Sequence, residues 1–429
     1  MKYFKQAWNL IKQEKLFSSI YIIGTGLSIT IVMTLFIVFY IKIGNIYPET
    51  NRDRMLIIKG GEVKTKNNTN SSYLSYGIIN NCIKKTTSAE AIAMTYYNYE
   101  DEYIQLGEGG KQLQVTTKYA DEQFWKVFSF RFINGKAFTE ADVQSGIRTA
   151  VISESLSKKL FGTTECIGEY LSLNFDSYRV CGVVKDVSLA LENSYAQLWV
   201  PYTVRSNYKE IFGMGDFLGM MNAFILAPSV KELDQVKEDI LENVKRYSSN
   251  YSGLTFTMYG QPDRHWENQF RESHQMPLEI KKIMWQYGII IFVLLFIPAI
   301  SLSGMTDSRM ERRLSEMGIR RSFGAPVNNL MNQIISENFL FTFLGGIFGL
   351  LLSYLLLFIT RDWIFQMSSP FVIPPIEGTH VAFSFDMLFN IPVFLIALLV
   401  CFILNLLSAL IPAWKASRRP IIYSLNAKQ

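Results

Sequence analysis

The chain has 429 residues, of which 49% are hydrophobic and 18% are charged, and its formal net charge is +5. A soluble protein averages about 25% charged residues, so this composition indicates a mixture of membrane-spanning and aqueous parts. The length exceeds that of one ordinary domain, and the small positive charge gives no reason to expect a nucleic-acid partner.

Four segments are apolar and long enough to cross a bilayer, which takes about 20 residues. They are residues 16–43, 284–305, 339–359 and 389–411. The first is too long for the hydrophobic region of a signal peptide and lacks a small-residue cleavage site, so we interpret it as a retained anchor. The sequence therefore predicts a membrane α-helical bundle of four transmembrane helices.

Basic residues gather beside the ends of these spans. They lie before the first span (Lys2, Lys5, Lys12, Lys15), between the second and third (Arg309, Arg312, Arg313, Arg320, Arg321) and after the fourth (Lys415, Arg418, Arg419, Lys428). Such residues mark the cytoplasmic side. We therefore predict cytoplasmic termini, with an amphipathic helix at 1–15, a coupling segment at 306–338 and a tail at 412–429, and we place 44–283 and a short loop at 360–388 outside.

Residues 44–283 alternate short β-rich runs with helical patterns, which predicts an α+β domain inserted between spans 1 and 2. Strands are expected at 55–58, 149–152, 170–173, 178–184 and 198–200, and helices at 153–161 and 230–244. Ser153 is the expected N-cap of the first of these helices, and Gly162 its end. The polar run 67–72 is interpreted as a loop, and residues 261–283 as a stalk leading to the second span.

Motifs of enzymatic chemistry are absent from the sequence. It contains no G-x-x-x-x-G-K-[ST], G-x-S-x-G or H-E-x-x-H. His265 and His274 are nine residues apart, on opposite faces of a straight helix, so they would not share a metal ion. We interpret both as solvated stalk residues and predict a chain that is not an enzyme.

Three cysteines fall in the predicted external domain: Cys82, Cys166 and Cys181. One disulfide between Cys166 and Cys181 is one interpretation, and buried free thiols are the other.

Small residues spaced four apart occur in two of the predicted spans. Gly24 and Ser28 lie in the first, and Gly345 and Gly349 in the third. Such spacing lets two helices approach closely, either across a dimer or within one subunit.

The coupling segment contains a compact feature between Gly318 and Gly324. These glycines bracket a short helical turn that carries Ile319, Arg320, Arg321 and Phe323. A short helix that carries apolar side chains and two arginines is suited to bind in a groove of another protein. A plain positive loop is the simpler interpretation of the same charges.

Beyond these patterns, the segment Glu316-Met-Gly-Ile-Arg-Arg-Ser-Phe-Gly-Ala325 resembles the cytoplasmic signature of MacB/FtsX-type ABC permeases. The tail at 412–420 resembles the C-terminal ending of that family, and the external stretches 124–142 and 151–162 are similar to its periplasmic domain. The resemblance covers essentially the whole chain in the same order.

The resemblance implies a permease subunit that pairs with a second permease, either itself or a paralogue, and with a separate ABC ATPase. The implied ATPase contacts are Glu316, Met317, Gly318, Ile319, Arg320, Arg321, Phe323 and Gly324. ATP and magnesium would belong to the ATPase, with no cofactor in this chain. The implied location is the cell inner membrane, with a porter-like lobe at 44–118 and 203–260 and a Sabre-like lobe at 119–202.

Three functions follow as alternatives. The chain passes ATP-driven motion to its periplasmic domain for export or extraction of substrate, with a periplasmic adaptor and an outer-membrane channel as further partners. Alternatively, it is an FtsX-like regulator of a periplasmic partner such as a cell-wall hydrolase. The third alternative is a membrane-anchored sensor or binding domain without an ATPase. The sequence does not identify a substrate.

Overall fold

The computed structural model describes residues 12, 15–105, 112–273, 275–312, 319, 322–324, 326–368 and 387, and several residues between 391 and 407. It divides into two compact units. The helical unit contains Met1–Tyr40, Ile280–Arg361 and Leu388–Gln429, and the sheet unit contains Ile41–Glu279 and Asp362–Met387.

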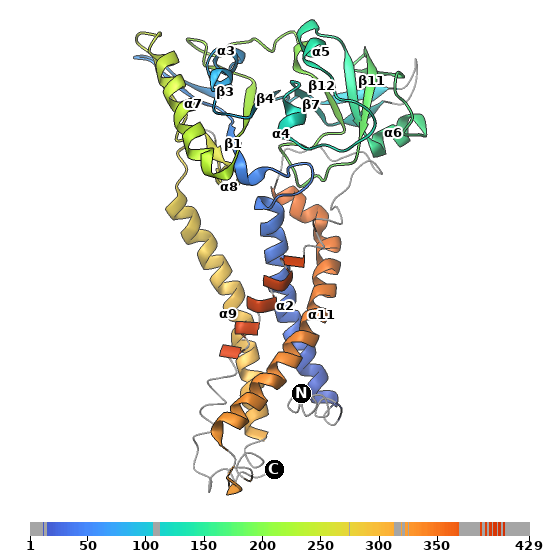
Figure 1. Ribbon diagram of the computed structural model, residues 1–429, viewed down its shortest axis with the longest axis vertical. Helices are drawn as coiled ribbons and strands as arrows, with labels where there is room; N and C mark the ends of the chain where they lie inside the picture. Colours follow the sequence, from blue (N-terminus) through green and yellow to red (C-terminus); the bar gives the residue numbers. More distant parts are fainter. Residues whose placement is uncertain are drawn as a thin grey trace. The chain divides into compact units, whose positions relative to one another are not determined.

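The described part of the helical unit contains three long helices, α2 (Lys15–Ile43), α9 (Ile280–Arg312) and α11 (Val327–Ser368) (Figure 1), and a shorter apolar helix at Phe394–Leu404. The stretches Ser18–Ile43 and Met331–Thr360 are long and apolar enough to cross a membrane, with mean hydropathies of 2.3 and 2.2. The first stretch lies within the predicted span 16–43, and the second contains the predicted span 339–359. The second predicted span lies in α9, and the fourth lies partly outside the described residues, so the four-span count stays a prediction.

Glycines of α11 lie directly against α2. A Cβ atom at Gly349 would lie 2.7 Å from the carbonyl oxygen of Gly26, and one at Gly345 would lie 3.0 Å from the side chain of Thr25. The Thr30 hydroxyl donates to the Gly26 carbonyl at 2.8 Å and approaches the Gly349 carbonyl at 3.3 Å. These two helices therefore pack within one chain through backbone contact that only glycine allows.

The other small pair is joined inside α2 itself. The hydroxyl of Ser28, which is buried, donates to the carbonyl of Gly24 at 2.9 Å. This bond satisfies the Ser28 side chain within its own helix. A dimer contact through Gly24 and Ser28 stays a prediction.

The sheet unit has two groups of strands. The strands of the first group are ordered β15 (Thr255–Thr257), β2 (Gly61–Lys64), β3 (Thr69–Leu74), β14 (Met221–Leu226) and β4 (Ala91–Tyr96). Three further strands pair beside this path. Strand β1 (Met55–Ile58) pairs with β14 and with β16 (Asp263–Arg264), and β13 (Leu218–Gly219) pairs with β3. All these pairings are antiparallel. Helices α3 (Tyr76–Asn81) and α7 (Leu233–Ser248) lie with this group (Figure 1). Helix α7 buries Val236, Ile240 and Val244, which recur every four residues as on one helix face.

The second group continues from β4 through β7 (Thr117–Ala120), β12 (Leu198–Pro201), β9 (Thr149–Ser153), β11 (Asp176–Val184), β10 (Tyr170–Leu173), β5 (Glu102–Gln105) and β6 (Leu113–Val115), with β8 (Phe132–Gly135) on β11. It is a mixed sheet, because β12 is parallel to β7 and β11 is parallel to β9. Helices α5 (Glu140–Ser145) and α6 (Glu154–Phe161) lie in this half (Figure 1), whereas α4 (Phe124–Val127) packs on β4 and β14 of the first group. Short 3-10 helices occur at Arg52–Arg54 (η1), Ile83–Lys85 (η2), Tyr202–Val204 (η3) and Val230–Glu232 (η4). The α+β prediction for this region is confirmed.

Local chemistry explains the boundaries of α6. The Ser153 hydroxyl accepts from the amide of Leu156, and Gly162 closes the helix with φ of +73°. A hydroxyl that accepts from an amide in the first turn and a left-handed glycine at the end are the usual caps. Both predicted caps are confirmed.

Two predicted boundaries differ from the structure. The run 67–72 is not all loop, because Thr69–Leu74 form β3, and backbone pairing to β2 and β14 outweighs the polar composition. Strands β5 and β6 precede residue 119, yet β5 pairs with β10, which groups both with the second half of the sheet unit.

The external cysteines are free thiols in the structure. Cys82 and Cys166 are buried, and Cys181 is partly buried. The sulfur of Cys166 lies 3.2 Å from the hydroxyl oxygen of Ser157. This agrees with the interpretation of these cysteines as free thiols rather than with a disulfide between Cys166 and Cys181.

Candidate functional site

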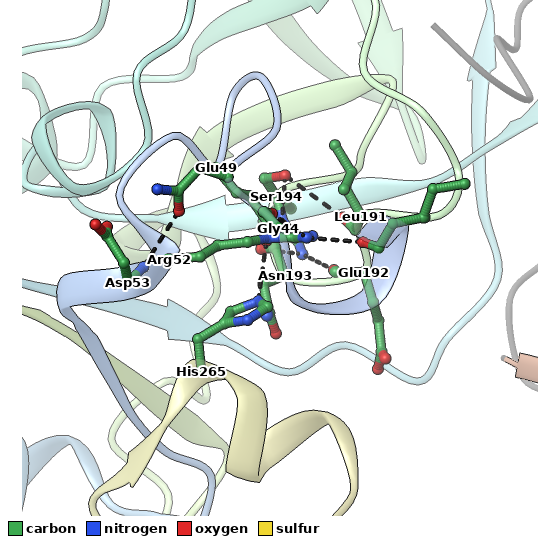
Figure 2. A network of polar contacts seen from close by, with 12 residues as sticks. Gly44, Glu49, Arg52, Asp53, Leu191, Glu192, Asn193, Ser194 and His265 are labelled. Carbon is green, nitrogen blue, oxygen red and sulfur yellow. Dashed lines mark hydrogen bonds and ion pairs between the residues drawn. The ribbon is translucent and has the colours of Figure 1, made fainter. Parts of the chain in front are cut away.

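A buried ion pair lies directly after α2. Glu49 and Arg52 are both buried, and the Arg52 Nε donates to a Glu49 carboxylate oxygen at 2.8 Å (Figure 2). The same guanidinium donates to the carbonyl oxygens of Ile41 and Gly44, at 2.8 Å each. The last carbonyls of a helix have no partner within the helix, and a cation beside them is favourable. Arg52 therefore fixes the C-terminal end of α2.

The second oxygen of Glu49 binds a turn of the second strand group. It accepts from the amide of Ser194 at 3.0 Å and from its hydroxyl at 2.7 Å. The indole of Trp199 on β12 donates to the Ser194 carbonyl at 3.3 Å, and the Lys118 ammonium on β7 donates to the carbonyl of Asn193 at 2.8 Å. The turn is thus anchored to two neighbouring parallel strands.

His265 approaches Glu49 from another element. It begins helix α8 (His265–Gln269), is 1% exposed, and its Nε2 lies 3.4 Å from the Glu49 carboxylate. Neither ring nitrogen hydrogen-bonds to any residue that the structure describes. The prediction of a solvated stalk histidine is wrong here, because β16 and α8 pack this segment into the first strand group. His274 lies outside the described residues.

A second buried arginine follows α8. Arg271 forms a bidentate ion pair with Asp263 on β16, at 2.5 Å and 2.7 Å. It also donates to the carbonyl of Met276 at 2.5 Å. The first residues of the predicted stalk are therefore folded onto the domain, and α9 begins only at Ile280.

The charges of the cluster follow from its burial. Burial alone raises the pKa of Glu49, but the charge of Arg52, the His265 ring and the bonds from Ser194 outweigh it and hold that pKa far below its usual range. Burial holds the pKa of His265 below its usual value in spite of the Glu49 carboxylate, so the ring is neutral at pH 7. Burial likewise lowers the pKa of Lys118 to about 8.

Glu49, Arg52, Ser194 and His265 are hereafter called the joint. Figure 2 shows them converging from the end of α2, the turn before β12 and the start of α8. All four residues of the joint lie within the sheet unit, whose first segment runs from Ile41 to Glu279. Because breaking a buried ion pair by removing one partner costs a large free energy, the joint stabilises the part of the sheet unit that directly follows α2.

Much of the predicted coupling segment lies outside the described residues, namely Glu316, Met317, Gly318, Arg320 and Arg321. Among its described residues, Ile319 is 48% exposed and Phe323 is 87% exposed. The Phe323 amide donates to the Ile319 carbonyl at 3.2 Å, and Gly324 follows with φ of +83°. This is a short helical turn that ends at a left-handed glycine, and its docking role stays a prediction.

Sequence reasoning missed the joint. The available signal was a Glu-x-x-Arg pair, Glu49 and Arg52, directly after a predicted span. Its partners Ser194 and His265 are distant in sequence and carry no motif.

Two family descriptions together match most of the chain. Residues 18–243 match the MacB-like periplasmic core domain, and residues 288–421 match the FtsX-like permease C-terminal region. The chain belongs to the MacB/FtsX-like family of ABC transporter permeases. It is therefore a membrane protein, and its sheet unit is the periplasmic domain.

Curated relatives have low sequence identity. The chain is 24% identical over 245 residues to the uncharacterized ABC transporter permease YknZ of Bacillus subtilis, covering 57% of each chain. It is 25% identical over 247 residues to the macrolide export ATP-binding/permease protein MacB of Aggregatibacter actinomycetemcomitans, covering 57% of this chain and 36% of that one. The chain thus spans roughly a third to three fifths of these relatives.

Solved structures of related domains also match. The extracellular domain of YknZ matches with a TM-score of 0.33 and 16% identity, covering 47% of this chain and 99% of that one. The periplasmic region of MacB from Actinobacillus actinomycetemcomitans matches with a TM-score of 0.33 and 18% identity, covering 47% and 87%.

Proposed function

We propose that this permease transmits ATP-driven motion of a separate ABC ATPase to its periplasmic domain, for export or extraction of substrate from the periplasmic side. The observation that supports the proposal is the joint, in which Arg52 binds the last carbonyls of α2 and Glu49 binds the turn before β12. In this proposal the buried ion pair provides a stiff link at the point where the chain leaves α2.

The input to this motion is the coupling segment. Ile319 and Phe323 present apolar surface to solvent, and Arg320 and Arg321 lie between them in sequence. An exposed aromatic residue beside arginines is the composition of an interface hot spot. The ATPase would bind here, and ATP with magnesium would stay on that subunit.

The remaining partners follow from the same proposal. A second permease, identical or paralogous, would complete the assembly in the inner membrane, with both termini cytoplasmic. The names of MacB and of the pyoverdine export protein PvdT of Pseudomonas savastanoi describe export by ATP-binding/permease chains. By analogy, a periplasmic adaptor and an outer-membrane channel would take the substrate onward.

Charge reversal tests the docking. The double variant Arg320→Glu/Arg321→Glu should lose co-purification with the ABC ATPase, because it opposes the charge on which docking depends. The matched control Arg418→Glu/Arg419→Glu makes the same charge change in the C-terminal tail and should retain binding. Unchanged binding of the first variant would contradict the docking, and equal loss in both would reduce it to a general effect of charge.

A further inference from the structure

The outer face of β6, β5 and β10 carries two rows of uncharged polar and aromatic side chains. Strand register places Gln105 opposite Ser172, and the antiparallel β5–β6 pairing continues this row to Gln112. The neighbouring row contains Tyr103, which pairs with Gln114. Because side chains alternate along a strand, the buried Ile104 and Leu173 point to the core while these residues face outward.

The turn between β10 and β11 adds an aromatic ring to this face. Asn174 and Phe175 have φ of +48° and +71°, a conformation that favours glycine, and the Phe175 side chain is 84% exposed. The turn is fixed to β5, because the Asn174 amide donates to the Tyr103 carbonyl at 2.9 Å and its side-chain oxygen accepts from the Tyr103 amide at 3.0 Å. Strained backbone conformations concentrate at binding and catalytic sites, and here the strained residue carries an exposed phenylalanine ring.

A shallow recess of about 90 Å³ lies between these residues. It is lined by Tyr103, Gln105, Gln112, Ser172, Asn174 and Phe175. That volume is the space of roughly three water molecules, so it holds a substituent of a ligand rather than a whole ring. The side chains of Gln105, Gln112 and Ser172 have no hydrogen-bond partner in the part of the chain that the structure describes.

The chemistry of the lining selects a class of ligand. Amides and a hydroxyl both donate and accept hydrogen bonds, which suits hydroxyl and acetamido groups. The rings of Tyr103 and Phe175 offer flat apolar surface to the face of a sugar. All six lining residues are uncharged, so an ionic ligand would find no opposite charge there, and a purely apolar one would leave the amides unpaired.

We infer that this face binds a neutral, N-acetylated glycan chain, with an acetamido group in the recess and a sugar ring stacked on Phe175. The site lies on the second strand group, away from the joint in sequence. It would hold the periplasmic domain to carbohydrate of the cell envelope, whatever substrate the permease handles.

The test titrates the full chain in lipid nanodiscs with tetra-N-acetylchitotetraose, followed by calorimetry. Nanodiscs are required because a maltoside detergent would itself present sugar to the site. Wild-type protein should bind, and the double variant Gln105→Ala/Gln112→Ala should bind at least roughly tenfold more weakly, which corresponds to about 1.4 kcal/mol. Phe175→Gly should show a similar loss, because glycine keeps the turn and removes the ring.

Two controls make the result specific. Cellotetraose has the same β-1,4 linkage without acetamido groups and should bind at least roughly tenfold more weakly. Met214→Ala, which removes an exposed apolar side chain elsewhere in the domain, should bind as the wild type does. The inference would be overturned if the wild type did not bind the glycan, or if the Gln105/Gln112 and Phe175 variants bound it as tightly as the wild type does. A protein partner that covers Phe175, together with no measurable glycan binding, would overturn it as well.

Discussion

Replacing Arg52 by methionine removes the cation of the joint at nearly constant side-chain length. Three hydrogen bonds are lost, one to Glu49 and one each to the carbonyls of Ile41 and Gly44. The Glu49 carboxylate stays buried, and Ser194 is then its one hydrogen-bond donor among the described residues. Breaking a buried ion pair by removing one partner costs about 3–5 kcal/mol, and we expect Arg52→Met to lower the free energy of unfolding by that amount.

Urea unfolding of the purified chain, followed by tryptophan fluorescence, measures this loss. Trp199 donates to the Ser194 carbonyl and therefore reports on the joint. The double variant Glu49→Gln/Arg52→Met should recover about 2 kcal/mol relative to the sum of the single changes, because no uncompensated charge remains.

Arg246→Met is the matched control for this substitution. Arg246 forms a surface pair with Glu242 in which both side chains are largely exposed, so its loss should cost about 0.3–0.5 kcal/mol. A cost below about 1 kcal/mol for Arg52→Met, or strict additivity of the Glu49 and Arg52 changes, would refute a stiff joint.

Three further predictions concern pH, helix packing and the strained turn. His265 has a pKa below its usual value, so the unfolded chain takes up this proton first, and stability should fall as pH drops below about 6.5; melting temperatures of His265→Gln should lack this part of the slope. Gly349→Ala should cost about 1–3 kcal/mol because its Cβ would lie 2.7 Å from the Gly26 carbonyl oxygen, whereas Gly288→Ala, with open space around it, should cost nothing and gain up to about 1 kcal/mol from helix propensity in the same unfolding assay. Phe175→Gly should raise the unfolding free energy by about 1 kcal/mol, and a decrease would contradict strain at this turn.

Much of the domain was predictable where local chemistry decides the structure. The β-branched and aliphatic residues at 55–58 and 170–173 form β1 and β10 with the predicted bounds. Ser153 and Gly162 cap α6 because a hydroxyl and a glycine each satisfy a requirement of their own helix end. In these cases the residues that predict the element lie next to one another in the sequence, so no distant residue is needed for the prediction.

The joint was not predictable in the same way, because its partners come together only through the fold. His265 lies in a polar segment that reads as a solvated stalk, and its burial depends on β16 pairing with β1. Strand β3 shows the same dependence, since Thr69 and its neighbours are polar yet form a ladder with β2. A polar segment is exposed as its composition predicts only when no strand or charged residue distant in sequence pairs with it in the fold.

One ion-paired arginine follows α2 and another precedes α9. Arg52 binds Glu49 and the carbonyls that end α2, and Arg271 binds Asp263 and the Met276 carbonyl shortly before α9 begins. A guanidinium is a planar group with several donors in fixed directions, so it constrains the direction of the backbone as well as its distance. A lysine would keep the charge but lose that constraint, since its ammonium is a point charge on a flexible stem. Arg52 and Arg271 therefore constrain the direction of the backbone after α2 and before α9 as well as its position.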